Sequence, residues 1–456
     1  MPRSPGPWGF RDQRCRVSDT SGQPVLVPAA GTTNDTEAAR DPRLDFFRGL
    51  GLFIILIAHI PWNNWTGWIP ARFGHSDATE IFVFCSGAAS AIAFYKVFQR
   101  RGWWIGTARI VLRIWQIYWC HVGVFLATLV ALIALDTTLE DPTRVYGSAL
   151  GLDPFLTDPR TFLSGLFTLG YVPNSFDILA MYIVILALVP LIAALARIGS
   201  GYAMGASVLI WALASQPWLA VVDLPVFGFL DLPADPADPG RVWFFNPFAW
   251  QLIFFTGFAL TAGWLPHPPA RPLWMIVAAA VLIASFLMDR GGAAVPPGPG
   301  SVAGLAPLFE PRPAAIAPPG SLDSKTYLGV LRYVHFLALA YLAWALAGDG
   351  GRHLRRSGLA GAAITIVRHT GQQSLAVFVA SLLIAQLLGV AIAENSIQGP
   401  EDPVYTPQWV VNIINLLGFV LIVMVAYSAR FFRSQPWSTN TTALYAPVQL
   451  SKNRRE

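Results

Sequence analysis

Hydrophobic runs of about 20 residues recur along the whole chain, and short polar segments separate them. A run of this length, wound as an α-helix, is long enough to cross the hydrocarbon core of a bilayer. The pattern therefore predicts an all-α fold, a polytopic bundle of about ten transmembrane helices. The expected ranges are 45–60, 79–96, 110–135, 175–197, 202–222, 248–265, 273–288, 326–347, 370–393 and 408–429. A weakly apolar piece at 161–170 is typical of a short interfacial helix.

The composition supports this interpretation. The chain is 54% hydrophobic and 12% charged, with a mean hydropathy of +0.50, whereas soluble domains carry about 25% charged residues. Its 17 Trp and 29 Phe suit the aromatic belts found at membrane interfaces. We therefore expect a multi-pass protein whose main surroundings are the lipid bilayer.

The segments outside the hydrophobic runs divide the chain. Residues 1–40 are polar, follow no apolar period and contain no signal-peptide core, which predicts a disordered cytoplasmic tail. Residues 41–430 form the predicted transmembrane domain, and 431–456 a cytoplasmic C-terminal tail. The Pro-, Gly- and Ala-rich stretch 289–325 is expected to be an extended loop.

The basic residues indicate an orientation. Most of the 31 Lys and Arg residues lie in alternate segments, mainly the two tails, 96–113 and 352–368. Positive loops face the cytoplasm, so both termini are predicted to be cytoplasmic. The net charge of +5 is thus explained by topology, and we predict no nucleic-acid partner.

Polar residues crowd into the first two predicted helices and their connection. Arg43, Asp45 and Arg48 precede the first apolar run. His59 closes that run and lies toward the outer face in the predicted orientation. The next run opens with a second polar group, formed by His75, Asp77 and Glu80. Ionisable groups are costly in a membrane and are functional candidates by default.

The basic end of the first helix has two interpretations. Asp45 and Arg48 are three positions apart, so they share a helix face and can pair. Together with Arg43 they are either an interfacial cluster that sets the depth of the helix or a cytoplasmic mouth where guanidinium groups bind phosphates.

The residues at the outer end of the first helix also have two interpretations. His59 lies roughly 16 Å along the helix from Arg48, and it is either a satisfied core residue or a general base toward a sugar hydroxyl. Asp77 and Glu80 suit either capping of the second helix or orientation of an imidazole. His75 is a second candidate base, and spacing alone does not choose between the two histidines.

Further along, Arg332 and His335 are spaced i,i+3 and share a face expected to point into the bundle. The chain contains no P-loop, HExxH, GxSxG or CxxC motif, and Cys15, Cys85 and Cys120 lack metal-ligand spacing. The motifs therefore give no support to a metal site or to nucleotide hydrolysis.

Four segments carry a resemblance to a known family. RLDFFRG, followed by an apolar helix ending in AHI, resembles the first segment of transmembrane acyltransferases. The segments FGHSDATEIFVFCSG, WFFNPFAWQLIFFTG and RYVHFLALAYLAW resemble the OpgC family, whose members transfer succinyl groups onto osmoregulated periplasmic glucans. The resemblance extends over about residues 41–430.

The resemblance implies an enzyme of the bacterial inner membrane. Cytoplasmic succinyl-CoA would be the acyl donor, with no permanently bound cofactor, and a hydroxyl of a periplasmic β-glucan would be the acceptor. His59 would be the catalytic imidazole, with Asp77, Glu80 and the alternative base His75 around it. Donor binding is assigned to Arg43, Asp45, Arg48, Arg332 and His335, with Arg332 as the candidate for holding the succinyl carboxylate.

Two other functions fit the same residues. An acetyltransferase acting on another cell-surface sugar would use the same chemistry with different substrates. A membrane transporter without covalent chemistry would also explain intramembrane His and Arg residues.

Overall fold

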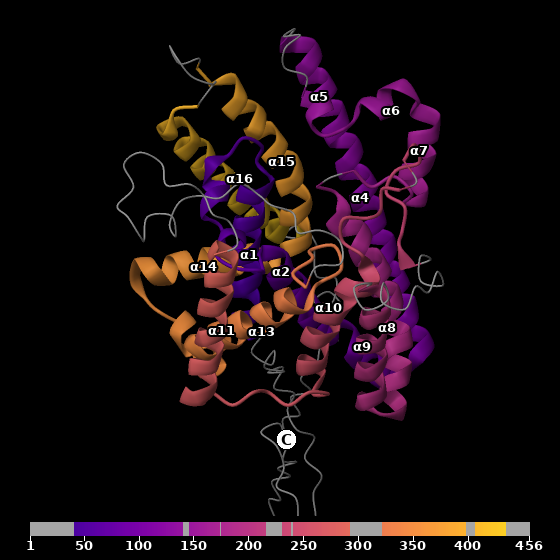
Figure 1. The fold of residues 1–456 in the computed structure, drawn as a ribbon, viewed down its shortest axis with the longest axis vertical. Helices are drawn as coiled ribbons and strands as arrows, with labels where there is room; N and C mark the ends of the chain where they lie inside the picture. The colour runs from indigo at the N-terminus through magenta and orange to yellow at the C-terminus, as the bar shows by residue number, and fades with distance from the viewer. Residues whose placement is uncertain are drawn as a thin grey trace, which may run out of the picture. The chain divides into compact units, whose positions relative to one another are not determined.

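The structure is a computed structural model that describes residues 41–139, 146–173, 175–215, 230–238, 240–291, 322–397 and 406–434. Within these residues the regular elements are helices, with one isolated bridge between Pro233 and Val242. The longer helices, shown in Figure 1, are α1 (Pro42–His59), α2 (Ala78–Ser90), α4 (Trp103–Leu139), α8 (Asp177–Ile198), α9 (Ser200–Ala214), α10 (Pro247–Ala262), α11 (Pro272–Gly291), α13 (Val330–Ala347), α14 (Gly358–Gln372), α15 (Ser374–Glu394) and α16 (Gln408–Ser434). The shorter ones are η1 (Asn64–Trp68), η2 (Pro70–Arg72), η3 (Ala91–Tyr95), α3 (Lys96–Arg101), α5 (Tyr146–Ala149), α6 (Asp153–Thr157), α7 (Pro159–Thr168) and η5 (Asp349–Leu354).

The predicted all-α fold is confirmed for the described residues. Each of the ten predicted ranges contains a long helix, and α7 lies where a short interfacial helix was expected. Six helices of the described part are long and apolar enough to cross a membrane, namely Ala78–Arg101, Trp103–Leu139, Asp177–Ile198, Val330–Ala347, Ser374–Glu394 and Gln408–Ser434. Ten crossings and the cytoplasmic placement of the termini stay predictions. The predictions for 1–40, for 435–456 and for most of the 289–325 loop lie outside the described residues.

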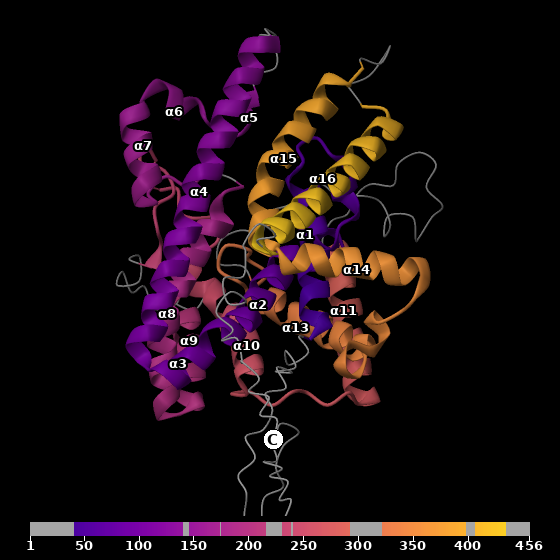
Figure 2. The same cartoon turned by 180° about the vertical axis from the view of Figure 1, so that it is seen from behind.

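Helix α14 differs from the sequence prediction, which assigned 352–368 to a basic loop. Glycines and polar residues interrupt the apolar pattern of this segment. It is nevertheless helical, and it packs closely against α1 (Figure 2). The reason is contact with the bundle: tertiary packing stabilises a helix that weak local periodicity does not reveal.

The crossing of α1 and α14 depends on two glycines. A Cβ atom on Gly49 of α1 would collide with the backbone of Val367, and one on Gly371 of α14 would collide with the backbone of Asp45. The two helix backbones are therefore in direct contact, as small residues allow in membrane bundles.

We expect the substitution Gly371→Ala to destabilise the protein by about 1–3 kcal/mol, because an added methyl group forces packed backbones apart. The measurement is the apparent melting temperature of the detergent-purified protein. Gly123→Ala is the matched control, since Gly123 is also helical but a Cβ there meets no atom within 4 Å. Equal melting temperatures for the two variants would contradict the close crossing.

Helices α1 and α13 together connect two distinct ends of the bundle. At one end, the Arg43 guanidinium stacks 3.3 Å from the centroid of the Trp344 ring and donates to the carbonyl of Gly348, just past α13. At the other end, α13 begins beside the start of α2, where Arg332 contacts Glu80. Arg43 lies at the first end. The acidic residues that open α2 and the histidines near them lie at the second end.

Candidate functional site

The start of α2 is fixed by a capping box. The Asp77 carboxylate accepts from the backbone N–H of Thr79 at 2.7 Å, and the Glu80 carboxylate accepts from the backbone N–H of Asp77 at 2.8 Å. This reciprocal arrangement satisfies two helix-terminal donors. Both acids therefore cap the helix, which is one of the two roles that their spacing allowed.

Two cations from a distant part of the chain complete a four-charge cluster, defined here as Asp77, Glu80, Lys325 and Arg332. Lys325 Nζ lies 2.5 Å from Asp77 Oδ2. Arg332 Nη1 lies 2.6 Å from Glu80 Oε1 and 3.9 Å from Asp77 Oδ2. The Glu80 side chain is fully buried, and such charges persist only when they are paired. The cluster contains two carboxyl groups and two cationic side chains.

The cluster determines the protonation of Asp77, which lies just before the membrane-length segment of α2. Burial on its own would raise the pKa of this carboxyl, but the charges of Lys325 and Arg332 outweigh burial and hold the pKa well below its ordinary value. Asp77 is therefore ionised at neutral pH. It can orient and stabilise a positive group, and it holds no proton to donate.

This lowered pKa gives a pH-dependent prediction for Asp77→Asn. The aspartate contributes stability above its ordinary pKa of 3.8, and this contribution disappears as the pH falls toward the lower folded-state value. At neutral pH the asparagine variant should melt below the wild type, and the difference should shrink as the pH falls through that range. Melting temperatures measured at several pH values test this, and a constant difference would contradict it.

His335 fastens the loop before α2 to α13. Its Nδ1 accepts from the backbone N–H of Ser76 at 3.3 Å and lies 2.7 Å from Ser76 Oγ. An N–H group only donates, so the ring proton belongs on Nε2. That nitrogen faces Gly74, where φ is +144° and a Cβ would collide with the ring. Because Ser76 is fully buried, this Ser–His pair holds the loop rather than facing a substrate.

His75 is packed into the same corner. It is 9% exposed, its Nδ1 lies 4.0 Å from Asp323 Oδ2, and its ring stands edge-on to His335 with centroids 6.1 Å apart. Substrate access to this imidazole is therefore restricted.

His59 has the geometry of a base. Its Nδ1 lies 2.8 Å from the carbonyl oxygen of Ile55, and a carbonyl only accepts, so Nδ1 carries the proton. Nε2 is then left with its lone pair. The ring is half-buried and interacts electrostatically with Lys325 and Asp77. His59 therefore lies within electrostatic range of two members of the four-charge cluster.

The predicted donor-binding residues fall into two groups. Arg332 and His335 belong to the end that carries His59. At the opposite end, Arg48 is buried and donates to the carbonyl of Cys85 at 2.8 Å, while the buried Asp45 accepts from Gln372 at 3.1 Å. These contacts hold α1 against α2 and α14. Their binding of a donor stays a prediction.

Three exposed arginines lie on α3 and on the first turns of α4, namely Arg100, Arg101 and Arg109. They belong to the basic segment 96–113. These guanidinium groups are more open to a phosphate ligand than Arg48 is.

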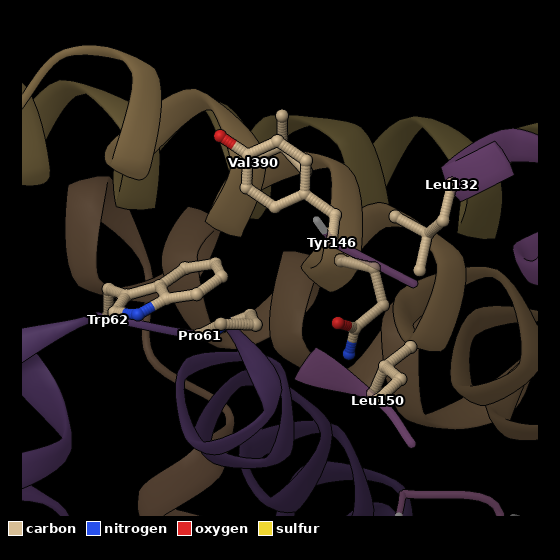
Figure 3. Close-up of a pocket in the computed structure, with 7 residues that line it drawn as sticks. Pro61, Trp62, Leu132, Tyr146, Leu150 and Val390 are labelled. Atoms are coloured by element: carbon tan, nitrogen blue, oxygen red, sulfur yellow. The ribbon is translucent and has the colours of Figure 1, made fainter. Parts of the chain in front are cut away.

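A pocket of about 310 Å³ lies beside the histidine end of α1 (Figure 3). It is lined by Pro61, Trp62, Leu132, Tyr146, Leu150, Gln386 and Val390. Gln386 Nε2 approaches the backbone oxygen of His59 at 3.4 Å, which connects the pocket to the imidazole-bearing turn.

Sequence reasoning missed Lys325 and the pocket. Lys325 is one of three lysines in the chain and lies seven positions before Arg332. An isolated lysine ahead of an intramembrane arginine was the available signal. The pocket has no comparable signal, because its residues come from separate parts of the chain.

Six helices of the described part are long and apolar enough to cross a membrane, which indicates a multi-pass membrane protein. Buried ionisable side chains, among them Asp77, Glu80, His75 and His335, gather where α2 and α13 begin. Comparison with known families matches the family described as OpgC protein over residues 40–434. The chain belongs to the OpgC family, as the resemblance predicted. This membership suggests a membrane acyltransferase. No curated protein and no solved structure matches the chain.

Proposed function

We propose that this protein is an inner-membrane O-acyltransferase that moves a succinyl group from cytoplasmic succinyl-CoA to a hydroxyl of a periplasmic β-glucan. The observation that carries the proposal is His59, whose Nδ1 is bound to the Ile55 carbonyl and whose Nε2 is thereby a base. Family membership supplies the reaction class, and the charges beside His59 supply the surroundings that the reaction needs.

The reaction then follows from the chemistry of the groups. A sugar hydroxyl is a weak nucleophile until a base removes its proton. His59 Nε2 takes that proton while the hydroxyl oxygen attacks the thioester carbonyl. The new ester C–O bond forms, the C–S bond breaks, and the departing thiolate takes the proton from the imidazole. Asp77, held ionised by its cations, stabilises the imidazolium that forms in between.

Lys325 is the best group to hold the succinyl carboxylate. The sequence analysis gave this role to Arg332, but the Arg332 side chain is 12% exposed and bound to the buried Glu80. The Lys325 side chain is 27% exposed and has three donor hydrogens, of which Asp77 needs one. A carboxylate on the acyl group gives the donor a second point of attachment.

The proposed orientation uses both ends of α1. With ten membrane crossings and cytoplasmic termini, the Arg43 end lies toward the cytoplasm and His59 lies roughly 16 Å beyond Arg48 along the helix. The donor phosphates would bind the exposed arginines of 96–113, with the pantetheine arm reaching toward His59. The glucan would approach from the opposite side.

The direct test is to mix purified protein with succinyl-CoA and a β-glucan and to determine the mass of the glucan. A succinyl increment supports the proposal. An acetyl increment, obtained only with acetyl-CoA, favours the acetyltransferase alternative. Transport of either compound in vesicles without a covalent product would favour the transporter.

Lys325→Met should reduce the preference for succinyl-CoA over acetyl-CoA by about 10- to 100-fold, the equivalent of one charge-assisted hydrogen bond. The ratio of kcat/KM values for the two donors measures it, and the ratio corrects for any general loss of activity. Lys96→Met is the control, because Lys96 is exposed at the start of α3. An unchanged ratio in the Lys325 variant would contradict the assignment.

A further inference from the structure

We infer that the pocket beside the histidine end of α1 is the subsite that binds one sugar unit of the acceptor glycan. The inference rests on the proposed function, which it extends by assigning residues to acceptor binding. The seven lining residues have no part in the proton transfer proposed above.

The position of the pocket is that of an acceptor site. Its lining residues come from the segment after α1, the last part of α4, the residues around α5 and the second half of α15. Each of these segments is at the periplasmic end of its helix in the proposed orientation. Pro61 follows His59 by two residues, and Gln386 approaches the His59 backbone oxygen. A sugar held here would be next to the proposed base.

The lining chemistry suits a pyranose. The rings of Trp62 and Tyr146 meet edge-to-face with centroids 5.9 Å apart, and Figure 3 shows both rings bordering the pocket near Pro61. Aromatic faces pack against the C–H surface of a sugar, while a polar group sets its orientation. The Gln386 side chain provides both a donor and an acceptor for hydroxyl groups.

The two aromatic rings of the pocket, Trp62 and Tyr146, are held in place, although the backbone conformation of Trp62 is unfavourable. Trp62 has a φ of +56°, a left-handed conformation that is unfavourable for a residue with a side chain. Its ring is nevertheless 55% exposed, so burial of the ring does not explain the conformation. Tyr146 is fixed by a hydrogen bond from its hydroxyl to the Glu394 carboxylate. The protein therefore positions two rings around open space.

The size and charge of the pocket argue against the acyl donor as its occupant. A volume of about 310 Å³ is at the small end of ligand sites, which span roughly 300–1,000 Å³. The seven lining residues include no Lys or Arg, so the phosphates of a CoA ester would find no counter-charge. One neutral sugar unit is small enough for this volume and needs no counter-charge.

The test measures binding of a linear β-glucan oligosaccharide to the purified full-length protein by calorimetry, with no acyl donor present. Trp62→Ala should raise the Kd at least tenfold. Val390→Trp, which fills the pocket, should do the same. Trp68→Ala is the matched control, because Trp68 is on the same loop and similarly exposed (58%) but does not line the pocket.

Kinetics provide a second measurement. With saturating succinyl-CoA, Trp62→Ala should raise the KM for the glucan and leave the KM for the donor unchanged. Wild-type affinity in both pocket variants would overturn the inference. Loss of oligosaccharide binding in those variants would support the subsite even if the wild type formed no acyl-glucan, in which case the proposed transfer reaction alone would fail.

Discussion

His59→Ala should leave a folded protein that transfers about 10²- to 10⁴-fold less acyl group to the glucan, the usual contribution of a positioned general base. The ring is half-buried, and its Nδ1 donates to the Ile55 carbonyl four residues earlier at 2.8 Å. That carbonyl also belongs to the helical backbone, so the fold depends little on the imidazole. The measurement is the initial rate of acyl-glucan formation, with the melting temperature as a check on folding.

His75→Ala is the informative comparison. His75 is packed between the Asp323 and His335 side chains, so its loss should lower the melting temperature and reduce the rate only moderately. A His59 variant that transfers at the wild-type rate, or a folded His75 variant that is inactive, would reverse the assignment of the base. His59→Gln refines the test, since glutamine has polar atoms but no basic nitrogen.

The helices could be predicted from the sequence because their signal is local. An apolar run of sufficient length indicates a helix wherever the rest of the chain lies, and each predicted range contains one. Helix α14 shows the limit of this reasoning. Its residues 358–372 mix glycines, Thr and Arg with apolar residues, and its helical state depends on α1, which is more than 300 positions away in the sequence.

The candidate site likewise combines contacts between sequence neighbours, which the sequence reveals, with contacts between distant residues, which it does not. The capping box of Asp77 and Glu80 involves residues three positions apart, so the local spacing already offered capping as one of two possible roles. The partners of these acids, Lys325 and Arg332, lie about 250 positions further along. No local pattern connects them. The sequence therefore identified the acids and left their protonation undetermined.

The basic end of α1 shows that two similar arginines can make different contacts with neighbouring helices. Arg43 and Arg48 are both arginines preceding an apolar run, a pattern that fits either an interfacial cluster or a phosphate-binding mouth. In the structure Arg43 stacks on Trp344 and Arg48 donates to the carbonyl of Cys85. Both side chains stabilise contacts between helices. Spacing along one helix does not reveal which neighbouring backbone oxygen an arginine will meet.

Arg332→Met should produce the largest loss of stability among the changes considered. The Glu80 carboxylate is fully buried and lies 2.6 Å from Arg332. Removing one member of a buried ion pair leaves the other charge uncompensated, at a cost of about 3–5 kcal/mol. We expect a clear fall in the melting temperature. Lys325→Met, which removes a cation with a more exposed side chain, should lower it less.

The double variant Arg332→Met with Glu80→Gln separates pairing from catalysis. Glutamine keeps an oxygen for the Asp77 backbone N–H, and no unpaired charge remains, so most of the lost stability should return. If Arg332 is a structural partner of Glu80, the recovered protein will also keep its preference for succinyl-CoA over acetyl-CoA. A stable double variant that has lost this preference would instead make Arg332 the group that holds the acyl carboxylate. A double variant as unstable as Arg332→Met would show that the two charges are not coupled. The outcome therefore decides which of the two cations beside the acids recognises the acyl group.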